Sequence, residues 1–222
     1  MVLSAFIVRA AILAEVETAN YIFGYGSLIN SESRAATAGM PTPSIPVRVA
    51  ASLGFVRTWN FHAPSGFTAL GLRPVKSGEA GIPINGVIYR VEGAMEAFDE
   101  REEGYDRLEV TRDKIEALFE SALPPASAKI WVYVPQPARP GQPGPQLPSR
   151  DYPLSQSYID VCLDGALEYN EAFAQEFLRT TEGWSAYWLN DRLLPRRPWV
   201  YQKSYKAVDR SLDSHSPSHT RR

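Results

Sequence analysis

Short runs of β-branched and aromatic residues, separated by turn-forming residues, recur along this chain before position 135. Runs of this length and composition are typical of β-strands. A glycine inside one of them, Gly54, indicates a bulge or bend. We therefore predict strands at 21–25, 47–61, 68–72, 84–91, 108–118 and 129–134.

Helical patterns are fewer and lie mainly after the strands. Ser31 is suited to cap a short helix over 31–39. A second short helix is predicted over 94–103, because Gly104 stands where a helix-ending glycine belongs. Helical spacing of apolar residues then extends over 155–181.

This order of elements predicts an α+β fold, built on a small, mainly antiparallel mixed β-barrel with short helices and C-terminal helices. We expect residues 1–20 to form a poorly ordered leader and 21–208 to form one domain. Within it, the proline- and glycine-rich stretch 135–153 is expected to be an exposed loop, and 184–205 has no clear pattern. Residues 209–222 are polar and aperiodic, so we predict a disordered tail.

Composition argues against several classes of partner. The formal net charge of the 222-residue chain is −2, so it lacks the basic surface that nucleic acids and anionic membranes attract. No apolar run approaches the length of a bilayer span. With Cys162 as the single cysteine, an intramolecular disulfide is impossible, and a cytoplasmic, reducing location is expected.

The first candidate binding element is the turn Phe23-Gly24-Tyr25-Gly26-Ser27-Leu28, which follows the first predicted strand. Glycines allow positive φ angles and a close approach of the backbone to a ligand. Successive amides in such a turn can bind an anion, and the helix that follows adds positive potential. A plain turn is the structural alternative. The glycine spacing fits neither of the common phosphate-binding loops.

The second candidate is a carboxylate on the apolar side of the short helix. At about 100° per residue, Met95, Phe98 and Glu102 share one stripe of that helix. A carboxylate held toward the core is suited to general acid–base catalysis if desolvation raises its pKa toward neutrality. The alternatives are a structural ion pair with Arg101 or Arg107, or an ordinary surface glutamate.

Together these segments resemble the γ-glutamylcyclotransferase superfamily, including its AIG2-like and ChaC-type members. Tyr25-Gly26-Ser27-Leu28 is similar to the substrate-binding loop, and Asp99 to Glu102 is similar to the segment with the catalytic glutamate. Gly86-Val87-Ile88-Tyr89 resembles the strand before that segment. The stretch from Ser157 to Ala166 resembles the C-terminal helix of the family, and the ordered set lies within 21–181.

The resemblance implies a γ-glutamylcyclotransferase-like fold and release of 5-oxoproline and an amine from a small γ-glutamyl compound. It implies Glu102 as the acid–base residue, although Glu103, directly before Gly104, is a second candidate. The substrate-binding residues would be Tyr25, Gly26, Ser27, Leu28 and Tyr158.

The reaction needs no cofactor or metal, and the chain's three histidines lack the spacing of metal ligands. Three questions stay open at this point: which γ-glutamyl compound is used, what the oligomeric state is, and whether the scaffold catalyses at all. A non-catalytic small-molecule-binding or regulatory module is the main alternative. An interaction domain that presents its proline-rich loop to a partner is another.

Overall fold

The strands are divided between two sheets in the computed structural model, which describes residues 19–93, 95–140, 143–196 and 203–215. The first sheet has the order β6-β8-β1-β5-β2-β7, with β6 Tyr105–Glu109, β8 Lys129–Pro135, β1 Asn20–Gly24, β5 Ile84–Arg90, β2 Ser44–Val49 and β7 Ile115–Ala117. The second has the order β10-β3-β4-β9-β11, with β10 Thr181–Glu182, β3 Phe55–Ala63, β4 Phe67–Pro74, β9 Leu154–Ser155 and β11 Trp188–Leu189.

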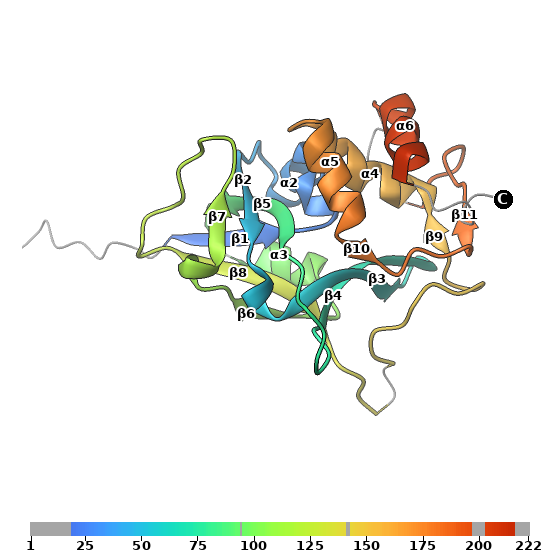
Figure 1. The fold of residues 1–222 in the computed structure, drawn as a ribbon, viewed down its shortest axis with the longest axis horizontal. Coiled ribbons are helices and arrows are strands. Elements are labelled where there is room, and N and C mark those ends of the chain that lie inside the picture. The colour runs from blue at the N-terminus through green and yellow to red at the C-terminus, as the bar shows by residue number, and fades with distance from the viewer. Residues whose placement is uncertain (1–18, 94, 141–142, 197–202, 216–222) are drawn as a thin grey trace, which may run out of the picture.

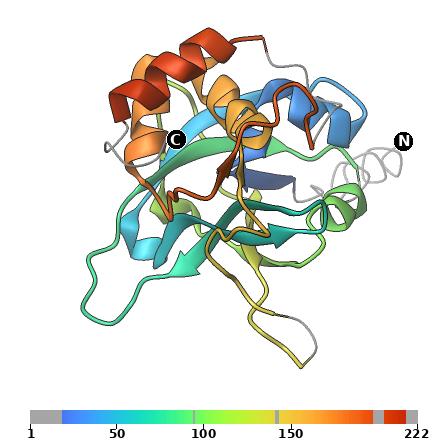
Figure 2. The same ribbon diagram turned by 90° about the vertical axis from the view of Figure 1, so that its right-hand side faces the viewer.

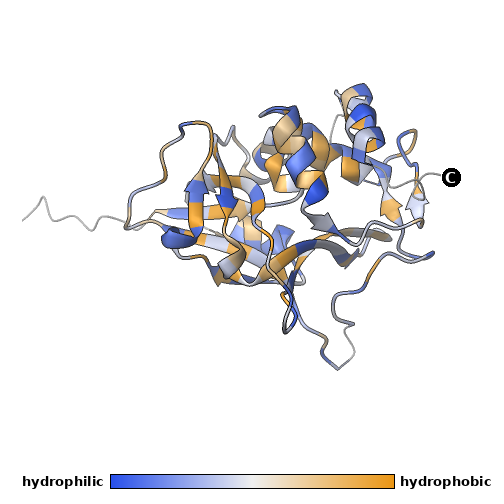
Figure 3. Ribbon diagram, viewed as in Figure 1, coloured by the Kyte–Doolittle hydropathy of each residue, from blue (hydrophilic) through white to orange (hydrophobic). Residues whose placement is uncertain are grey.

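Helices cover the sheets mainly from one side, where α4, α5 and α6 lie together (Figures 1 and 2). The described α-helices are α2 Ser31–Ala38, α3 Glu96–Arg101, α4 Gln156–Leu167, α5 Glu171–Arg179 and α6 Tyr205–His215. Three short 3₁₀ helices are η1 Ser27–Ile29, η2 Ala51–Leu53 and η3 Arg112–Lys114. Hydrophilic and hydrophobic residues both occur on α5 and α6, as expected of helices with one face against a core (Figure 3). The predicted mixed α+β class is confirmed.

Strand β1 lies inside the first sheet and carries the chain into the candidate binding turn. It pairs antiparallel with β5, with Ile22 opposite Tyr89, and parallel with β8, with Tyr21 opposite Ile130. Ile22 and Phe23 are both buried although they point to opposite faces of the strand. Coverage on both faces explains why this strand reads as a continuous apolar run rather than an alternating one.

The predicted strand over 47–61 is two strands that belong to different sheets. β2 pairs with β5, whereas β3 pairs with β4. Gly54 joins them at a φ of 83°, a left-handed conformation that glycine adopts without strain. The prediction of an interruption there is correct, but the glycine turns a corner between sheets rather than making a bulge. The register shift within this pair lies instead between Trp59 and Phe61.

The predicted strand over 108–118 is wrong as a single element. Its first part continues β6, which pairs with β8, and its last part is β7, which pairs with β2. These two strands lie at opposite edges of the first sheet, and η3 connects them. The apolar pattern runs through both strands, so it carries no sign of the change of partner.

The helix boundaries differ from expectation at one cap. Asn30, not Ser31, caps α2, because its side-chain oxygen accepts a hydrogen bond of 2.9 Å from the Ser33 amide. The predicted helix over 155–181 is two helices, α4 and α5. A second asparagine cap, Asn170, starts α5 by accepting from the Phe173 amide at 2.8 Å.

In 184–205, the segment without a clear sequence pattern, Asp191 anchors the chain to the start of α4. Its buried carboxylate accepts the Ser157 amide at 2.8 Å and the hydroxyls of Ser155 and Ser157 at 2.8 and 2.6 Å, at the start of α4. Burial alone would raise the pKa of Asp191, but these hydrogen bonds and one from the Arg196 amide outweigh it and lower the pKa.

The predicted disordered tail needs a correction for residues 209–215, which belong to α6. Val208 and Leu212 of this helix are buried in the core, and the Arg192 side chain bridges Asp209 to the buried Asp160. These long-range contacts order a segment that has little apolar periodicity of its own. Residues 216–222, and 1–18 of the expected leader, lie outside the described residues. Within the described part, none of the helices is long and apolar enough to cross a membrane.

Candidate active site

The candidate binding turn leaves β1 at Gly24 and folds back on itself through η1. A Cβ atom on Gly24 would lie only 2.9 Å from the Cβ of Leu28, so this position requires glycine for the close approach. Neither Gly24 nor Gly26 has a positive φ, so of the two properties of glycine considered from the sequence, it is the close approach that this turn uses. The first amides of a helix have no acceptor within that helix, and Ser27 and Leu28 are the first two residues of η1.

Two buried arginines hold the carbonyl groups of this turn. Arg57 of β3 donates to the Tyr25 carbonyl at 3.2 Å, and Arg34 of α2 donates to the carbonyls of Leu28, at 3.0 Å, and Ile29. Both arginines are almost completely buried. Burial lowers the pKa of Arg57 to about 9, so its guanidinium remains charged at neutral pH. With the carbonyls tied to the arginines, the turn has one fixed conformation.

Glu102 ends α3 directly opposite this turn. Its amide donates to the Phe98 carbonyl at 2.9 Å, and the buried Phe98 anchors the helix to the core. Gly104 follows with a φ of 91°, which turns the chain into β6. The side chain of Glu102 is only 17% exposed, whereas the next residue, Glu103, is exposed to solvent. The structure thus favours Glu102 over Glu103 as the inward carboxylate.

The turn and Glu102 line one small cavity, which we call the inner recess, with a volume of about 40 Å³. All six residues singled out in the sequence lie around it: Tyr25, Gly26, Ser27, Leu28, Glu102 and Tyr158. Its other lining residues are Phe23, Gly24, Leu70, Tyr105 and Tyr133. The site therefore combines segments that are far apart in the sequence.

Two of the tyrosine hydroxyls in the recess already donate hydrogen bonds to main-chain carbonyls. Tyr25 donates its hydroxyl to the Tyr133 carbonyl at 2.7 Å, and Tyr105 donates to the Leu70 carbonyl at 2.8 Å. Burial, followed by the charge of Glu102, raises the pKa of Tyr25 well above its usual value. Tyr25 is therefore a neutral, fixed wall of the site rather than a free donor.

The hydroxyl of Tyr158, which reaches the recess from α4, lies against Gly26. A Cβ atom on Gly26 would lie 3.4 Å from this oxygen. The Tyr158 ring packs edge-on against the buried Trp59, with centroids 5.9 Å apart, and this contact helps to fix the position of the hydroxyl. Of the two tyrosines named from the sequence, Tyr158 is the better placed to contact a ligand above Gly26.

Arg101 joins the two halves of the site, a role that the sequence did not indicate. Its Nε lies 3.2 Å from a carboxylate oxygen of Glu102, and its Nη2 donates to the hydroxyl of Ser27 at 3.1 Å. The same guanidinium donates to the Ser33 carbonyl of α2 at 2.9 Å. The ion pair with Arg101 that the sequence left as an alternative is thus present. Glu102 lines the recess while Arg101 lies beside it without lining the recess, so the ion pair leaves the carboxylate facing the cavity.

Arg107, the other arginine considered as a partner of Glu102, pairs with Asp99 instead. The two side chains approach to 2.9 Å, and Asp99 also accepts the hydroxyl of Tyr133 at 2.7 Å. This cluster ties α3 to β6 and β8 from the side away from the recess. It supports the position of α3 and meets the recess only through Tyr133, since neither Arg107 nor Asp99 lines the recess.

A larger cavity, the outer cleft, opens from the inner recess and has a volume of about 870 Å³. Ser27, Glu102, Tyr105 and Tyr158 line both. One wall of the cleft comes from the proline-rich stretch, which extends away from the helices (Figures 1 and 2). The Gln146 amide fixes that wall to β3 by donating to the Asn60 carbonyl at 2.8 Å.

Among the described residues, no group of three or more histidine, cysteine or acidic side chains is arranged to hold a metal ion. His62 stacks on Tyr152 with ring centroids 4.2 Å apart, and Cys162 is completely buried in α4. The polar side chains that line the recess are Glu102, Ser27 and four tyrosines, and the guanidinium of Arg101 lies beside Glu102.

Comparisons with known proteins match the chain to solved structures. No family model and no curated protein sequence matches it. The crystal structure of YkqA from Bacillus subtilis superposes with a TM-score of 0.50 at 17% identity, covering 77% of this chain and 57% of YkqA. The chain shares this fold.

The structural matches also include γ-glutamyl cyclotransferases, the family that the sequence resembles. A γ-glutamyl cyclotransferase matches with a TM-score of 0.47 at 15% identity, over 70% of this chain and 86% of that one. A yeast γ-glutamyl cyclotransferase specific to glutathione matches with a TM-score of 0.37 at 14% identity, over 91% and 99% of the two chains. At these identities the likeness concerns the fold alone, so the chemistry has to be inferred from the residues of the recess.

Proposed function

We propose that this protein is a γ-glutamyl cyclotransferase that releases 5-oxoproline and an amine from a small γ-glutamyl compound. One observation carries the proposal. Glu102 and the turn at Tyr25–Leu28 line the same recess, while Glu103 is exposed to solvent and does not line it. A carboxylate and an anion-binding turn in one small cavity suit a substrate with both an ammonium and a carboxylate. The γ-glutamyl group carries both on its α-carbon.

In the proposed reaction the α-amine of the γ-glutamyl group attacks its own γ-carbonyl carbon. Glu102 first accepts a proton from the α-ammonium, which frees the lone pair of the nitrogen. The ring C–N bond forms, and the original amide C–N bond breaks as Glu102 returns the proton to the departing nitrogen. Glu102 then accepts the second proton of the ring nitrogen and passes it to the released amine, which leaves as an ammonium. Proton transfer by a placed side chain typically contributes ~10²–10⁴ in rate. Holding the flexible substrate in its cyclic conformation contributes further.

Arg101 and the turn have complementary parts in this proposal. Arg101 lies 3.2 Å from a carboxylate oxygen of Glu102 and would hold that side chain in its orientation beside the substrate. The amides of Ser27 and Leu28 would bind the α-carboxylate or the oxyanion that develops on the γ-carbonyl oxygen. The hydroxyl of Tyr158, beside Gly26, would donate to the same oxygen. A cytoplasmic setting and the absence of a cofactor belong to the same proposal.

The test is an assay of 5-oxoproline release from a panel of γ-glutamyl amino acids, γ-glutamyl amines and glutathione. Wild-type protein should turn over at least one member, and Glu102→Gln should lose that activity while its unfolding curve stays close to that of wild type. Binding of the same compounds without turnover by the wild type would replace the proposal with a non-catalytic binding module. If the wild-type protein neither binds nor turns over any of these compounds, the proposed function is wrong and only the fold assignment remains.

A further inference from the structure

The sizes of the two cavities indicate which part of a substrate each of them can hold. The inner recess, at about 40 Å³, has room for only a few water-sized positions, whereas the outer cleft has about 870 Å³. Glu102 lies where they meet, because it lines both. If a γ-glutamyl head points into the recess, the bond to be broken lies beside Glu102. The amine portion then extends into the outer cleft, which shares Ser27, Glu102, Tyr105 and Tyr158 with the recess.

The first surface that such an amine portion meets is a pair of aromatic rings. Phe61 of β3 and Tyr105 of β6 both line the cleft, and their ring centroids are 4.3 Å apart at an angle of 39°. Tyr105 follows Gly104 and is fixed by its hydroxyl bond to Leu70. A Cβ atom on Gly104 would lie 2.9 Å from the ring of Phe61, so this ring lies against the main chain two residues after Glu102.

Apolar residues continue this surface beyond the Arg101–Glu102 ion pair, which also lines the cleft. Phe67, Ala69 and Pro135 line the cleft and are buried. By contrast, Glu100, Glu103 and Arg139 line it but are exposed. Next to the ion pair the cleft therefore has an aromatic and apolar surface, and exposed charges lie at its rim. Such a surface favours an apolar group over a small or polar one, because apolar surface is removed from water.

From this arrangement we propose that the outer cleft is the subsite for the amine portion of the substrate. We further propose that it prefers γ-glutamyl compounds with an aromatic ring or similar bulky apolar group close to the scissile nitrogen. This inference rests on the proposed function for the direction of the substrate. The preference itself is a property of binding and holds whether or not turnover follows. Phe61 is its specificity-determining residue.

The experiment compares γ-glutamyl-phenylalanine with γ-glutamyl-alanine in two measurements. Calorimetric binding to Glu102→Gln reports the preference alone, and kcat/KM of the otherwise wild-type protein reports its use in turnover. We expect at least a roughly tenfold preference for the phenyl compound in both, as is usual for a group that fills an apolar pocket. Phe61→Ala, in either background, should reduce this preference to about threefold or less.

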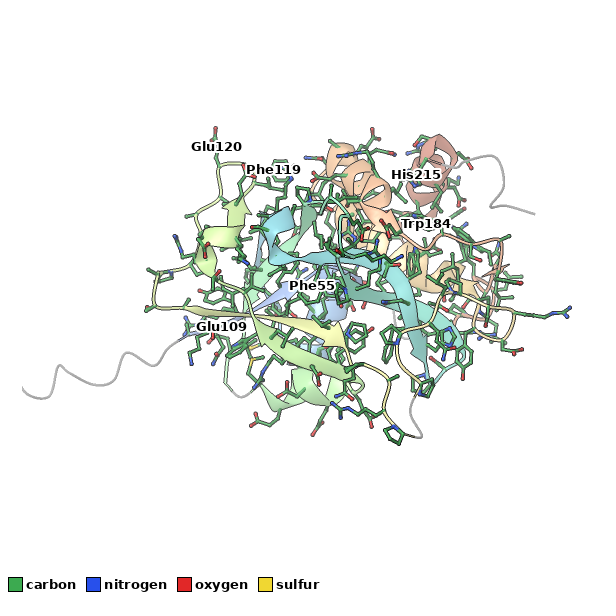
Figure 4. All side chains as sticks on the ribbon, turned by 60° about the horizontal axis from the view of Figure 1, so that its bottom comes forward. Phe55, Glu109, Phe119, Glu120, Trp184 and His215 are labelled. Atoms are coloured by element: carbon green, nitrogen blue, oxygen red, sulfur yellow. The ribbon has the colours of Figure 1, made fainter. Side chains whose placement is uncertain are left out.

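Phe55→Ala is the matched control, because Phe55 lies on the same strand, is also partly buried and lines neither cavity (Figure 4). It should keep the preference. If Phe61→Ala does not fold, Phe61→Leu takes its place and should give an intermediate preference. Equal affinity for the two compounds, no binding of either, or an unchanged preference without the Phe61 ring would overturn the inference. A binding preference without any release of 5-oxoproline would uphold the subsite and contradict the proposed function.

Discussion

The buried guanidinium of Arg57 donates a hydrogen bond of 3.2 Å to the main-chain carbonyl of Tyr25, the first residue of the binding turn. Within the described residues, all the hydrogen-bond acceptors of Arg57 are uncharged. The others are Asn85, Phe177, Thr180 and Thr181. A buried charge is costly unless it is fully hydrogen-bonded. This arginine therefore joins the turn to α5 and to both sheets through one planar group.

Replacing Arg57 by lysine tests this junction. Lysine keeps the positive charge but cannot reach acceptors on several elements at once. Each buried acceptor left without a donor costs about 1–3 kcal/mol, so we expect the free energy of unfolding in urea to fall by about 3 kcal/mol or more. Arg90→Lys is the control, because Arg90 is 57% exposed, and it should change stability by less than about 0.5 kcal/mol. Equal stability of Arg57→Lys and wild type would contradict the role of Arg57.

The choice between the two adjacent glutamates is open to a direct comparison. Glu102→Gln should reduce the rate of 5-oxoproline release by ~10²–10⁴, because the amide cannot accept the proton. Glu103→Gln and Glu109→Gln should keep the wild-type rate. Glu109 is exposed at the end of β6 and lines neither cavity (Figure 4). Loss of activity in Glu103→Gln with Glu102→Gln unaffected would transfer the role to Glu103.

Gly26→Ala is expected to separate binding from stability. The new methyl group would lie 3.4 Å from the Tyr158 hydroxyl oxygen and 3.5 Å from Leu70, which are ordinary contacts. It would nevertheless occupy space in a recess of only about 40 Å³. We expect the affinity for γ-glutamyl compounds to fall at least about tenfold, with little change in Tm.

Gly24→Ala is its counterpart, because there the methyl group would lie 2.9 Å from the Cβ of Leu28. That variant should lose about 1–3 kcal/mol of stability. If Gly26→Ala binds substrate as wild type does, the recess does not hold the γ-glutamyl head.

Arg101 is expected to matter for rate beyond its part in stability. Arg101→Gln removes the cation 3.2 Å from Glu102 and the hydrogen bond to Ser27. We expect at least a roughly tenfold lower kcat/KM, with Arg101→Lys partly restoring it because the charge returns without the planar geometry. Arg107→Gln should retain activity, since Arg107 pairs with Asp99 outside both cavities. Equal activities of Arg101→Gln and Arg107→Gln would contradict a role of Arg101 in the reaction.

Asp191 should give the fold a defined dependence on acid. Its pKa is lowered in the folded protein, so its stabilising effect is complete above the unfolded value of about 3.9 and is lost as pH falls through the lower, folded value. In urea unfolding, wild type should exceed Asp191→Asn clearly at pH 6, and the difference should shrink below pH 4. A difference independent of pH would show that the charge of Asp191 is not what matters.

Local sequence patterns predicted the strands that are buried on both faces, and the family resemblance predicted that a glycine turn and Glu102 share one site. They failed where a partner decides the structure. The split of 108–118 depends on which strands lie beside it, and α6 is ordered by the burial of Val208 and Leu212 against other helices. Arg34 and Arg57 were not foreseen because charged residues are rarely buried, and nothing near them in the sequence marks the exception.

The hydroxyl of Tyr25 bonds to a carbonyl 108 positions later in the chain, at Tyr133, and Arg57 bonds to Thr181 across 124 positions. During translation, the turn and Glu102 therefore leave the ribosome well before the strands and helix that hold them in place. Contacts at such separations make folding slow compared with that of local, helical domains. A nascent chain that stops short of α5 should be inactive and dependent on chaperones, however complete its recess residues are.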